Sequence, residues 1–345
     1  MKTWQKLKAN LKLWDRYFIR EKVIKAIRKF LDSQSFHEVE APILISHPPA
    51  ESHLEVFETK LLDRNRQATP AYLSTSPEVP LKKLMVAGIG NCYAMTKSFR
   101  NMETHGNLHN PEFTILEFYR VGADYRTIME DTEQLVIAIA RSINTDSLTI
   151  TYAGKAIDLT PPWKRLSVAQ AFEKYAHVHF DDFLDEKKAR EIAKEKGYAV
   201  EKNTTWEQLY NQILLNEIEP HLGRGKPTIL YDFPSSMAAL SKKKASDPRF
   251  AERFEFYIAG LELGDCYCEL TDAKEQEERF KREQEEIKRM GKTAYAYDHD
   301  FIEALKTGLP ECSGIAIGVD RLIMLFADVA DIADTLFFPG KEMFD

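Results

Sequence analysis

No hydrophobic run in this sequence approaches the roughly 20 residues that a membrane-spanning helix needs, so we expect no membrane association. The first 24 residues, MKTWQKLKANLKLWDRYFIREKVI, predict an amphipathic basic helix without the apolar segment of a secretory signal. Together these two absences predict a cytoplasmic protein.

Cysteine is scarce, and the four cysteines show no zinc-ligand spacing. Cys266 and Cys268 are one residue apart, a poor spacing for a structural disulfide, so we expect reduced thiols. A net charge of −7 argues against broad, nonspecific binding of nucleic acid, although it leaves room for a local basic patch.

The 345 residues, 44% hydrophobic and 29% charged, have the composition of an ordinary folded protein with a sizeable core. One large domain and two smaller ones both fit this length. The sequence shows no internal repeat, low-complexity tract or flexible linker.

Hydrophobic periodicity predicts both helices and strands. Helices are expected at residues 12–35, 79–88, 124–143, 272–290 and 319–329. Strands are expected at residues 36–44 (interrupted by Pro42), 54–61, 70–75, 91–99, 110–120, 227–234, 253–270 and 313–318. The charged, loop-rich region at about 160–225 is predicted to be a helical insertion between halves of one sheet. Because strands and helices do not alternate regularly, we expect an α+β fold with a mainly antiparallel sheet flanked by helices.

The stretch HNPEFTILEFYR, residues 109–120, places a carboxylate among aromatic and β-branched residues. With strand alternation, Phe113, Glu117 and Tyr119 share one face. A buried acid is costly without a partner, so this face either lies on the surface or binds a cation. A polar loop precedes the strand, and Arg100 ends the strand before that loop. The planar guanidinium group of Arg100 suits binding of a carboxylate or a phosphate. The simpler alternative is that Arg100 is an ordinary surface residue.

Acids also interrupt the aromatic run FEFYIAGLELGDCYCELTDA, residues 254–273. Strict alternation separates Glu262 from Glu255, Asp265 and Glu269, and a bulge at Gly264 is expected to restore them to one face. Four acids here indicate binding of Mg²⁺, of an ammonium, or of both. An exposed strand face is the alternative.

The third segment, CSGIAIGVDRLIMLF, begins at residue 312. Gly314, Ala316 and Gly318 share one nearly bare strand face, which permits close approach of a backbone or ligand. Arg321 is expected in the first turn of the helix that follows.

These segments resemble the three signature motifs of class II aminoacyl-tRNA synthetases. FHEVEAPIL is similar to motif 1, with Pro42 as its dimer-interface proline. SFRN through HNPEFTILEFY is similar to motif 2, and GIAIGVDRL to motif 3. HNPEFT, the Glu117-x-Tyr119 pair and ELTDAKEQEERF resemble lysyl-tRNA synthetase. Motif 1 begins near residue 30, which leaves no room before it for an anticodon-binding domain, so the chain is expected to lack one. TSPE at 75–78 and Ala316 resemble the free-standing EpmA (PoxA/GenX) paralogues that lysylate elongation factor P.

The resemblance implies a single class II catalytic domain over residues 1–345, acting as an ATP-dependent, AMP-forming ligase. It implies activation of (R)-β-lysine, or lysine, with ATP and Mg²⁺, and transfer to a lysine ε-amine of elongation factor P. It also implies a homodimer and makes tRNA an unexpected acceptor.

The family's functional residues carry over by position. The catalytic residues implied are Arg100, Glu262 and Arg321. The ATP site implied is Arg100, Asn101, Glu103, His109, Asn110, Phe113, Glu255, Glu262, Leu263, Gly318 and Arg321, with Glu255 and Glu262 as metal ligands. The amino-acid site implied is Ser76, Pro77, Glu78, Glu117, Tyr119, Asp265, Glu269 and Ala316. Glu117 and Tyr119 would hold the distal ammonium with Glu269 opposite, and Glu78 the other amine.

Two positions depart from the family pattern. The motif 2 loop is one residue longer, which alters the expected reach of Glu103 towards ATP. Asp265 and Cys266 replace a common Asn-Gly, and the extra charge favours two ammonium groups but repels a carboxylate. Two other functions stay open: a stand-alone enzyme that charges tRNA or another amine, and a non-catalytic amino-acid-binding regulator.

Overall fold

The computed structural model of the chain describes residues 1–103, 106–144 and 147–344. Its framework is an eight-stranded sheet in the order β1-β5-β6-β13-β12-β11-β10-β9. The five central pairings are antiparallel, and the two outermost pairings are parallel. The strands are β1 (His37–Glu38), β5 (Cys92–Phe99), β6 (Glu112–Val121), β9 (Lys164–Ser167), β10 (Thr228–Pro234), β11 (Phe250–Ile258), β12 (Leu261–Cys268) and β13 (Cys312–Gly318). The predicted mainly antiparallel α+β fold is confirmed.

One face of this sheet is covered by three helices. They are α2 (Trp14–Ser33), α4 (Tyr125–Ile143) and α11 (Val319–Phe326). Leu116 and Phe118 of β6 lie fully buried against them, whereas Glu117 and Tyr119 point to the opposite face. The alternation in residues 109–120 therefore separates the main core from the polar face.

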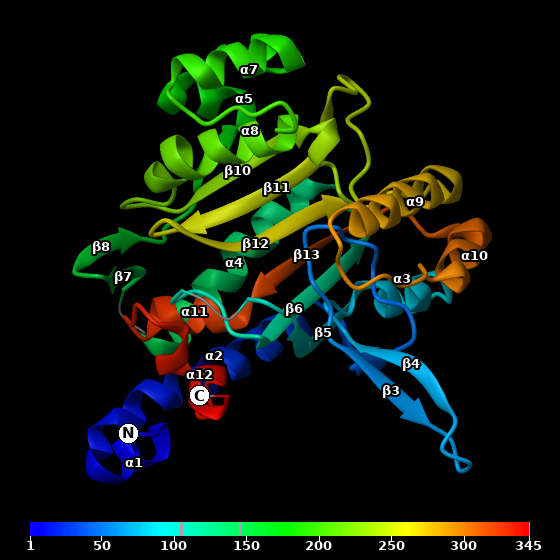
Figure 1. Cartoon of the computed structure of the whole chain (residues 1–345). Coiled ribbons are helices and arrows are strands. Elements are labelled where there is room, and N and C mark those ends of the chain that lie inside the picture. The colour runs from blue at the N-terminus through cyan, green and yellow to red at the C-terminus, as the bar shows by residue number, and fades with distance from the viewer. Residues whose placement is uncertain (104–105, 145–146, 345) are drawn as a thin grey trace.

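Helices pack against the opposite face at its two ends (Figure 1). At the β5 end lie α3 (Glu78–Val86), α9 (Ala273–Arg289) and α10 (His299–Gly308), which bury Ala94 and Tyr119. At the β10 end lie α5 (Val168–Ala171), α6 (Phe180–Phe183), α7 (Glu186–Glu195) and α8 (Trp206–Ile213), with a second core that contains Leu230 and Tyr257. The polar stretch of the sheet lies between these two hydrophobic clusters.

Residues 36–44 do not form the single strand that was expected. β1 joins the large sheet, and β2 (Leu44–Ile45) joins a separate sheet with β4 (Ala68–Leu73) and β3 (Glu58–Leu62). Pro42 lies between β1 and β2, and because it has no N–H to donate, it interrupts the hydrogen-bond ladder there. The chain thus changes sheets at Pro42. A small hairpin of β7 (Thr149–Tyr152) and β8 (Lys155–Asp158) was not expected.

The N-terminal segment is also broken where one helix was expected. α1 (Thr3–Ala9) ends at Asn10, which has an extended backbone and accepts a hydrogen bond from the Lys12 amide at 3.1 Å. This local bond offers the backbone an alternative to the helix. α1 lies beside α12 (Gly340–Met343), because Thr3 donates from its amide and hydroxyl to Glu342, at 2.7 and 2.8 Å (Figure 1).

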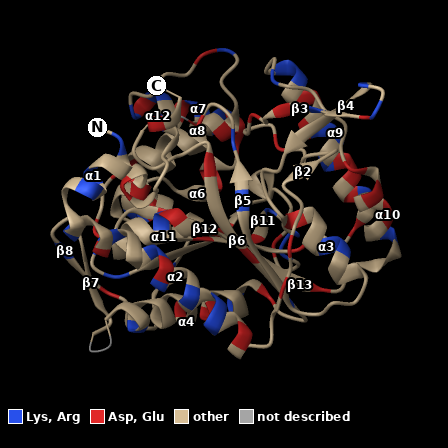
Figure 2. Ribbon diagram, turned by 90° about the horizontal axis from the view of Figure 1, so that it is seen from below, with Lys and Arg blue, Asp and Glu red and all other residues tan. Residues whose placement is uncertain are grey.

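Acidic and basic residues are interspersed along the helices in Figure 2. All four cysteines are buried free thiols, as expected. Among the described helices, none is long and apolar enough to cross a bilayer.

Candidate active site

A single row of paired residues crosses the sheet on the face opposite α2, α4 and α11. The strand registers pair Ala94 with Glu117, Glu117 with Ala316, Ala316 with Asp265, and Asp265 with Glu255. Directly paired residues project to the same face. Three acids from three strands, far apart in the sequence, therefore lie in one row across β6, β12 and β11, and Ala316 is the small residue between two of them.

A bulge is present next to Gly264, one residue before the predicted position. Gly264 pairs with Phe256 and Glu262 pairs with Tyr257, so Leu263 is the extra residue. This shift turns Glu262 onto the same face as the row of acids, against strict alternation. It also turns the Leu263 side chain into the main core, where it is 2% exposed. The Leu263 side chain therefore points away from that face, so its predicted place in the ATP site depends on its backbone and stays a prediction.

The bare face of β13 is only partly open. A Cβ on Gly314 would lie 2.3 Å from the ring of Tyr119, so this ring already fills the space expected for a ligand. At Gly318 the nearest atom to an added Cβ is in the Arg321 side chain, at 3.8 Å. Close approach by a ligand is thus feasible near Gly318 and Ala316 but not at Gly314.

Two hydroxyl groups hold the carboxylate of Glu117 in the predicted amino-acid site. It is 2% exposed and accepts hydrogen bonds from the Ser76 hydroxyl at 2.6 Å and the Tyr119 hydroxyl at 3.1 Å. Burial and the nearby Glu78 raise the pKa of Glu117 to about 8, against the lowering effect of these two donors. Ser76 and Pro77 lie at the start of α3, which places Glu78 in its first turn.

Lys82 is a cation that the sequence did not single out. Its ammonium lies between the carboxylates of Glu78 and Glu269, and both its side chain and that of Glu269 are almost fully buried. Burial opposes the charge of Lys82, but Glu269 and Glu78 together raise its pKa above the ordinary lysine value. Of three negative formal charges on Glu78, Glu117 and Glu269, Lys82 offsets one.

Arg253 is the second cation that the sequence did not single out. It binds Asp265 through two nitrogens at 3.0 and 2.8 Å and Glu255 at 2.8 Å. The Tyr267 hydroxyl donates to Asp265 at 2.7 Å, and the Tyr257 hydroxyl donates to Glu255 at 2.5 Å. The extra charge at Asp265 is therefore already paired, and the expected repulsion of a substrate carboxylate is reduced.

Glu255 and Glu262 together would supply two protein ligands to a Mg²⁺ ion. Both lie on the same face, one buried and the other with a side chain that is 44% exposed. No group of three or more candidate metal ligands occurs among the described residues. Mg²⁺ in nucleotide sites commonly takes one or two carboxylates and completes its shell with phosphate oxygens and water. Two carboxylates suffice for this mode, and their role stays a prediction.

The two arginines of the predicted nucleotide site have different surroundings. The guanidinium of Arg100 lies 5.2 Å from the Phe113 ring centroid and 3.8 Å from Glu103, and its Nε has no hydrogen-bond partner in the described part of the chain. Arg321 donates to the Glu262 carbonyl at 2.8 Å and contacts the His109 ring at 2.9 Å. Arg100 thus retains free hydrogen-bonding capacity.

Two asparagines of motif 2 are engaged within the chain. Asn110 donates to the Glu112 carbonyl at 2.5 Å and accepts from the Gly340 amide at 2.9 Å. Asn101 accepts from the Met102 amide at 2.9 Å. Asn110 therefore joins motif 2 to the C-terminal segment, which leaves its predicted contact with adenine untested.

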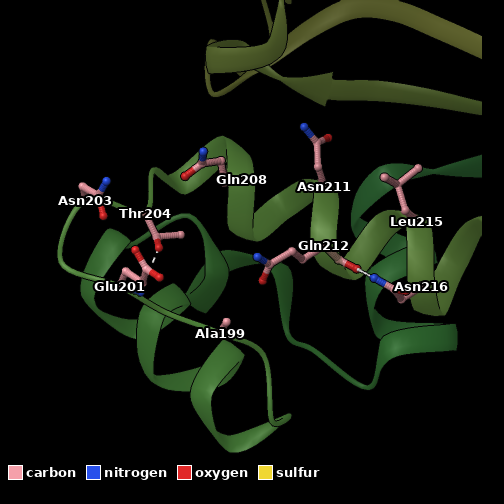
Figure 3. A pocket seen from close by; sticks show the side chains of 9 residues that line it. All are labelled: Ala199, Glu201, Asn203, Thr204, Gln208, Asn211, Gln212, Leu215 and Asn216. Atoms are coloured by element: carbon pink, nitrogen blue, oxygen red, sulfur yellow. Dashed lines mark hydrogen bonds between the residues drawn. The ribbon is translucent and has the colours of Figure 1, made fainter. Parts of the chain in front are cut away.

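A separate cavity of about 470 Å³ lies in the helical region over β10 (Figure 3). Its lining comes from α8 and neighbouring segments and is rich in amides: Ala199, Glu201, Asn203, Thr204, Gln208, Asn211, Gln212, Leu215 and Asn216. It contains none of the residues predicted for the active site.

The sequence matches the model of the family "tRNA synthetases class II (D, K and N)" over residues 3–342. It is 36% identical over 339 residues to a lysine–tRNA ligase of Carboxydothermus hydrogenoformans, covering 96% of this chain and 66% of that protein. It is 37% identical over 323 residues to a lysine–tRNA ligase of Moorella thermoacetica, covering 94% of this chain and 64% of that protein. The chain thus spans slightly less than two thirds of these relatives. It belongs to the class II tRNA synthetase family of the D, K and N type.

Proposed function

We propose that the chain activates a diamino acid, (R)-β-lysine or lysine, with ATP and Mg²⁺. The product is an aminoacyl-adenylate, and the acyl group then passes to a lysine ε-amine of elongation factor P. Membership of the synthetase family supports the activation step. The choice of amino acid is inferred from individual residues, and the choice of acceptor from the resemblance of residues 75–78 and Ala316 to the free-standing paralogues.

The observation that carries this proposal is the charge of the buried acid cluster. Glu78, Glu117 and Glu269 are all less than 10% exposed, and Lys82 offsets one of their three formal charges. When all three acids are ionised, as binding of cations favours, two negative charges remain, which matches two ammonium groups on one substrate. Charge-assisted hydrogen bonds contribute roughly 1.5–3 kcal/mol each, enough to select a diamino acid over a neutral one.

The remaining groups suit activation. Arg100, with an unpartnered Nε, is suited to a substrate carboxylate and the α-phosphate. Glu255 and Glu262 would hold Mg²⁺ on the phosphates, where the metal supplies charge neutralisation. Arg321 would bind the far end of the nucleotide. These arginines and Glu262 are all present, which disfavours the non-catalytic regulator.

Ala316 supports (R)-β-lysine as the preferred substrate. It lies between Glu117 and Asp265 in the row across the sheet, so its methyl group narrows the site there. In a β-amino acid the amino group is one carbon farther from the carboxylate. We infer that the narrowed site favours this longer separation.

Charging of tRNA is a second candidate, because the relatives described above are named lysine–tRNA ligases. The earlier expectation that tRNA is not an acceptor has no support from these relatives. A homodimer also stays a proposal. The acceptor can be tested with radiolabelled amino acid, ATP and either elongation factor P or lysine tRNA.

Label on elongation factor P, lost when its acceptor lysine is replaced by arginine, is the expected result. Label on tRNA alone would favour the second candidate. Mass spectrometry of the modified protein would identify the attached amino acid by its mass and the acceptor by its position.

A further inference from the structure

The transfer step has a chemical requirement to which none of the residues above has been assigned. A lysine ε-amine has an ordinary pKa of roughly 10.4, so an acceptor arrives as an ammonium near neutral pH. Its nitrogen has no lone pair with which to attack a carbonyl until one proton leaves. A group beside the reacting carbonyl must accept that proton.

The loop of residues 46–57, between β2 and β3, is fixed beside the candidate site. Glu55 forms a β-bridge with Asn101, and the Asn101 amide donates to the Glu55 carbonyl at 2.8 Å. On the other side, the Ser52 amide donates to Glu283 at 2.7 Å and Lys292 donates to the Ser52 carbonyl at 2.6 Å. The loop is therefore held beside Asn101, the residue that follows Arg100.

Glu51 lies in this loop, half-buried and next to the buried Ala50. Its carboxylate makes no hydrogen bond or ion pair with any side chain that the structure describes. The Tyr295 hydroxyl, which donates to the Pro49 carbonyl of this loop at 2.9 Å, lies within electrostatic range of Glu51. Arg100, Glu78 on α3, Glu283 on α9 and Asp265 on β12 also act on its charge. An unengaged carboxylate thus lies among groups from both sides of the amino-acid site.

We propose that Glu51 is the general base that deprotonates the acceptor amine. The Glu51 carboxylate takes one proton from the acceptor ammonium, and the freed nitrogen attacks the carbonyl carbon of the aminoacyl-adenylate. The C–N bond forms, the bond from that carbon to the phosphate oxygen breaks, and AMP leaves. The second nitrogen proton goes to AMP or water, and Glu51 returns its proton to solvent.

The electrostatics suit this role. Burial raises the pKa of Glu51 to about 7; Arg100 opposes this effect, whereas Glu78, Glu283 and Asp265 add to it. A base with a pKa near the working pH is ionised often enough to act and basic enough to accept a proton. The surrounding acids also favour the approach of a cationic acceptor.

This inference rests on the proposed function, and Glu51→Gln separates the two. The variant keeps the size of the side chain and removes the base. Three rates are compared: amino-acid-dependent pyrophosphate exchange, single-turnover transfer to elongation factor P, and transfer to hydroxylamine. Hydroxylamine is unprotonated near neutral pH and needs no base to expose its lone pair. Glu58→Gln, the same change on the exposed strand β3, is the matched control.

For Glu51→Gln we expect exchange and hydroxylamine transfer within about threefold of wild type and transfer to elongation factor P slower by about 10²-fold. Its residual transfer should keep rising with pH towards the ordinary lysine pKa, whereas wild-type transfer should level off above about pH 7. Equal slowing with both acceptors, unchanged transfer to elongation factor P, or loss of exchange would overturn the role of Glu51. Absence of exchange in the wild-type chain would overturn the proposed function itself.

Discussion

The ammonium of Lys82 contacts the carboxylate of Glu269 where both side chains are shielded from water, at 2% and 1% exposure. The same ammonium contacts Glu78, one helical turn earlier on α3. Lys82 therefore sets the net charge of the acid cluster from inside the protein. A buried cation of this kind stabilises the fold only while its partners remain in place.

Replacing Lys82 with methionine should leave buried carboxylates uncompensated. We expect the free energy of unfolding, measured by urea denaturation at pH 8, to fall by about 3–5 kcal/mol. The loss should be smaller at pH 5, because protonation can then neutralise the acids.

Lys25→Met is the matched control. Lys25 forms an ion pair with Glu21 on the surface of α2, and both side chains are more than half exposed. It should cost no more than about 0.5 kcal/mol. A Lys82→Met loss as small as this would contradict the account of the cluster.

The raised pKa of Glu117 predicts a pH-dependent amino-acid affinity. Below about pH 8 this carboxyl is largely protonated in the free chain, and an ammonium binds the ionised form. KM for the diamino acid should therefore fall as pH rises from 6 to 8. Glu117→Gln should raise KM at pH 8 by roughly 10- to 150-fold, equivalent to about 1.5–3 kcal/mol, and weaken this pH dependence. Glu112→Gln, with its side chain 53% exposed on the same strand, should leave KM unchanged.

The raised pKa of Glu117 also makes the stability of the folded chain depend on pH. The folded chain holds a proton on Glu117 that the unfolded chain has lost between pH 4.5 and about 8. This group therefore contributes a fall in stability as pH rises through that range. A bound diamino acid should reverse the trend, so the increase in Tm on ligand addition should be larger at pH 8 than at pH 6. Equal increases would count against this linkage.

Gly314→Ala should disturb the amino-acid site through Tyr119. The added methyl would overlap the Tyr119 ring and displace the hydroxyl that donates to Glu117. We expect a stability loss of about 1–3 kcal/mol, with a higher KM for the amino acid. Gly318→Ala, where the nearest atom is 3.8 Å away, should cost less stability, as thermal unfolding of both variants would reveal.

Arg253 and Asp265 should behave as a coupled pair. Arg253→Gln alone leaves two buried or half-buried acids without their cation, whereas the added Asp265→Asn removes one of those charges. A double-mutant cycle of unfolding free energies should give a coupling of about 1–3 kcal/mol. Additive losses would indicate that the two side chains do not depend on each other.

The spacing of apolar and polar residues along the sequence predicted those parts of the fold in which side chains alternate between two faces. The two faces of β6 followed from the spacing of apolar and polar residues, and a bulge within one residue of its observed place followed from Gly264. The break at Asn10 did not, because the apolar spacing continues across it and a single side-chain hydrogen bond decides the outcome. The split at Pro42 was visible as an interruption, but which sheet each half would join depends on long-range pairing.

The acids of the site were predictable because carboxylates stand out in an aromatic strand. The cations that pair with these acids, Lys82 and Arg253, were not predictable. Lys82 precedes Lys83 on a short helix, and nothing in the sequence marks which of the two is buried. Arg253 was inconspicuous because its partners lie two residues away on its own strand and on the neighbouring strand. Such pairings exist only once the strands are in register.

Amino-acid-dependent exchange of pyrophosphate into ATP tests the central claim most directly. The assay compares (R)-β-lysine, (S)-β-lysine, α-lysine and a neutral amino acid of similar length. We predict exchange with the diamino acids, fastest with (R)-β-lysine, and none above background with the neutral one. Exchange with no diamino acid, or equal exchange with the neutral compound, would contradict the account.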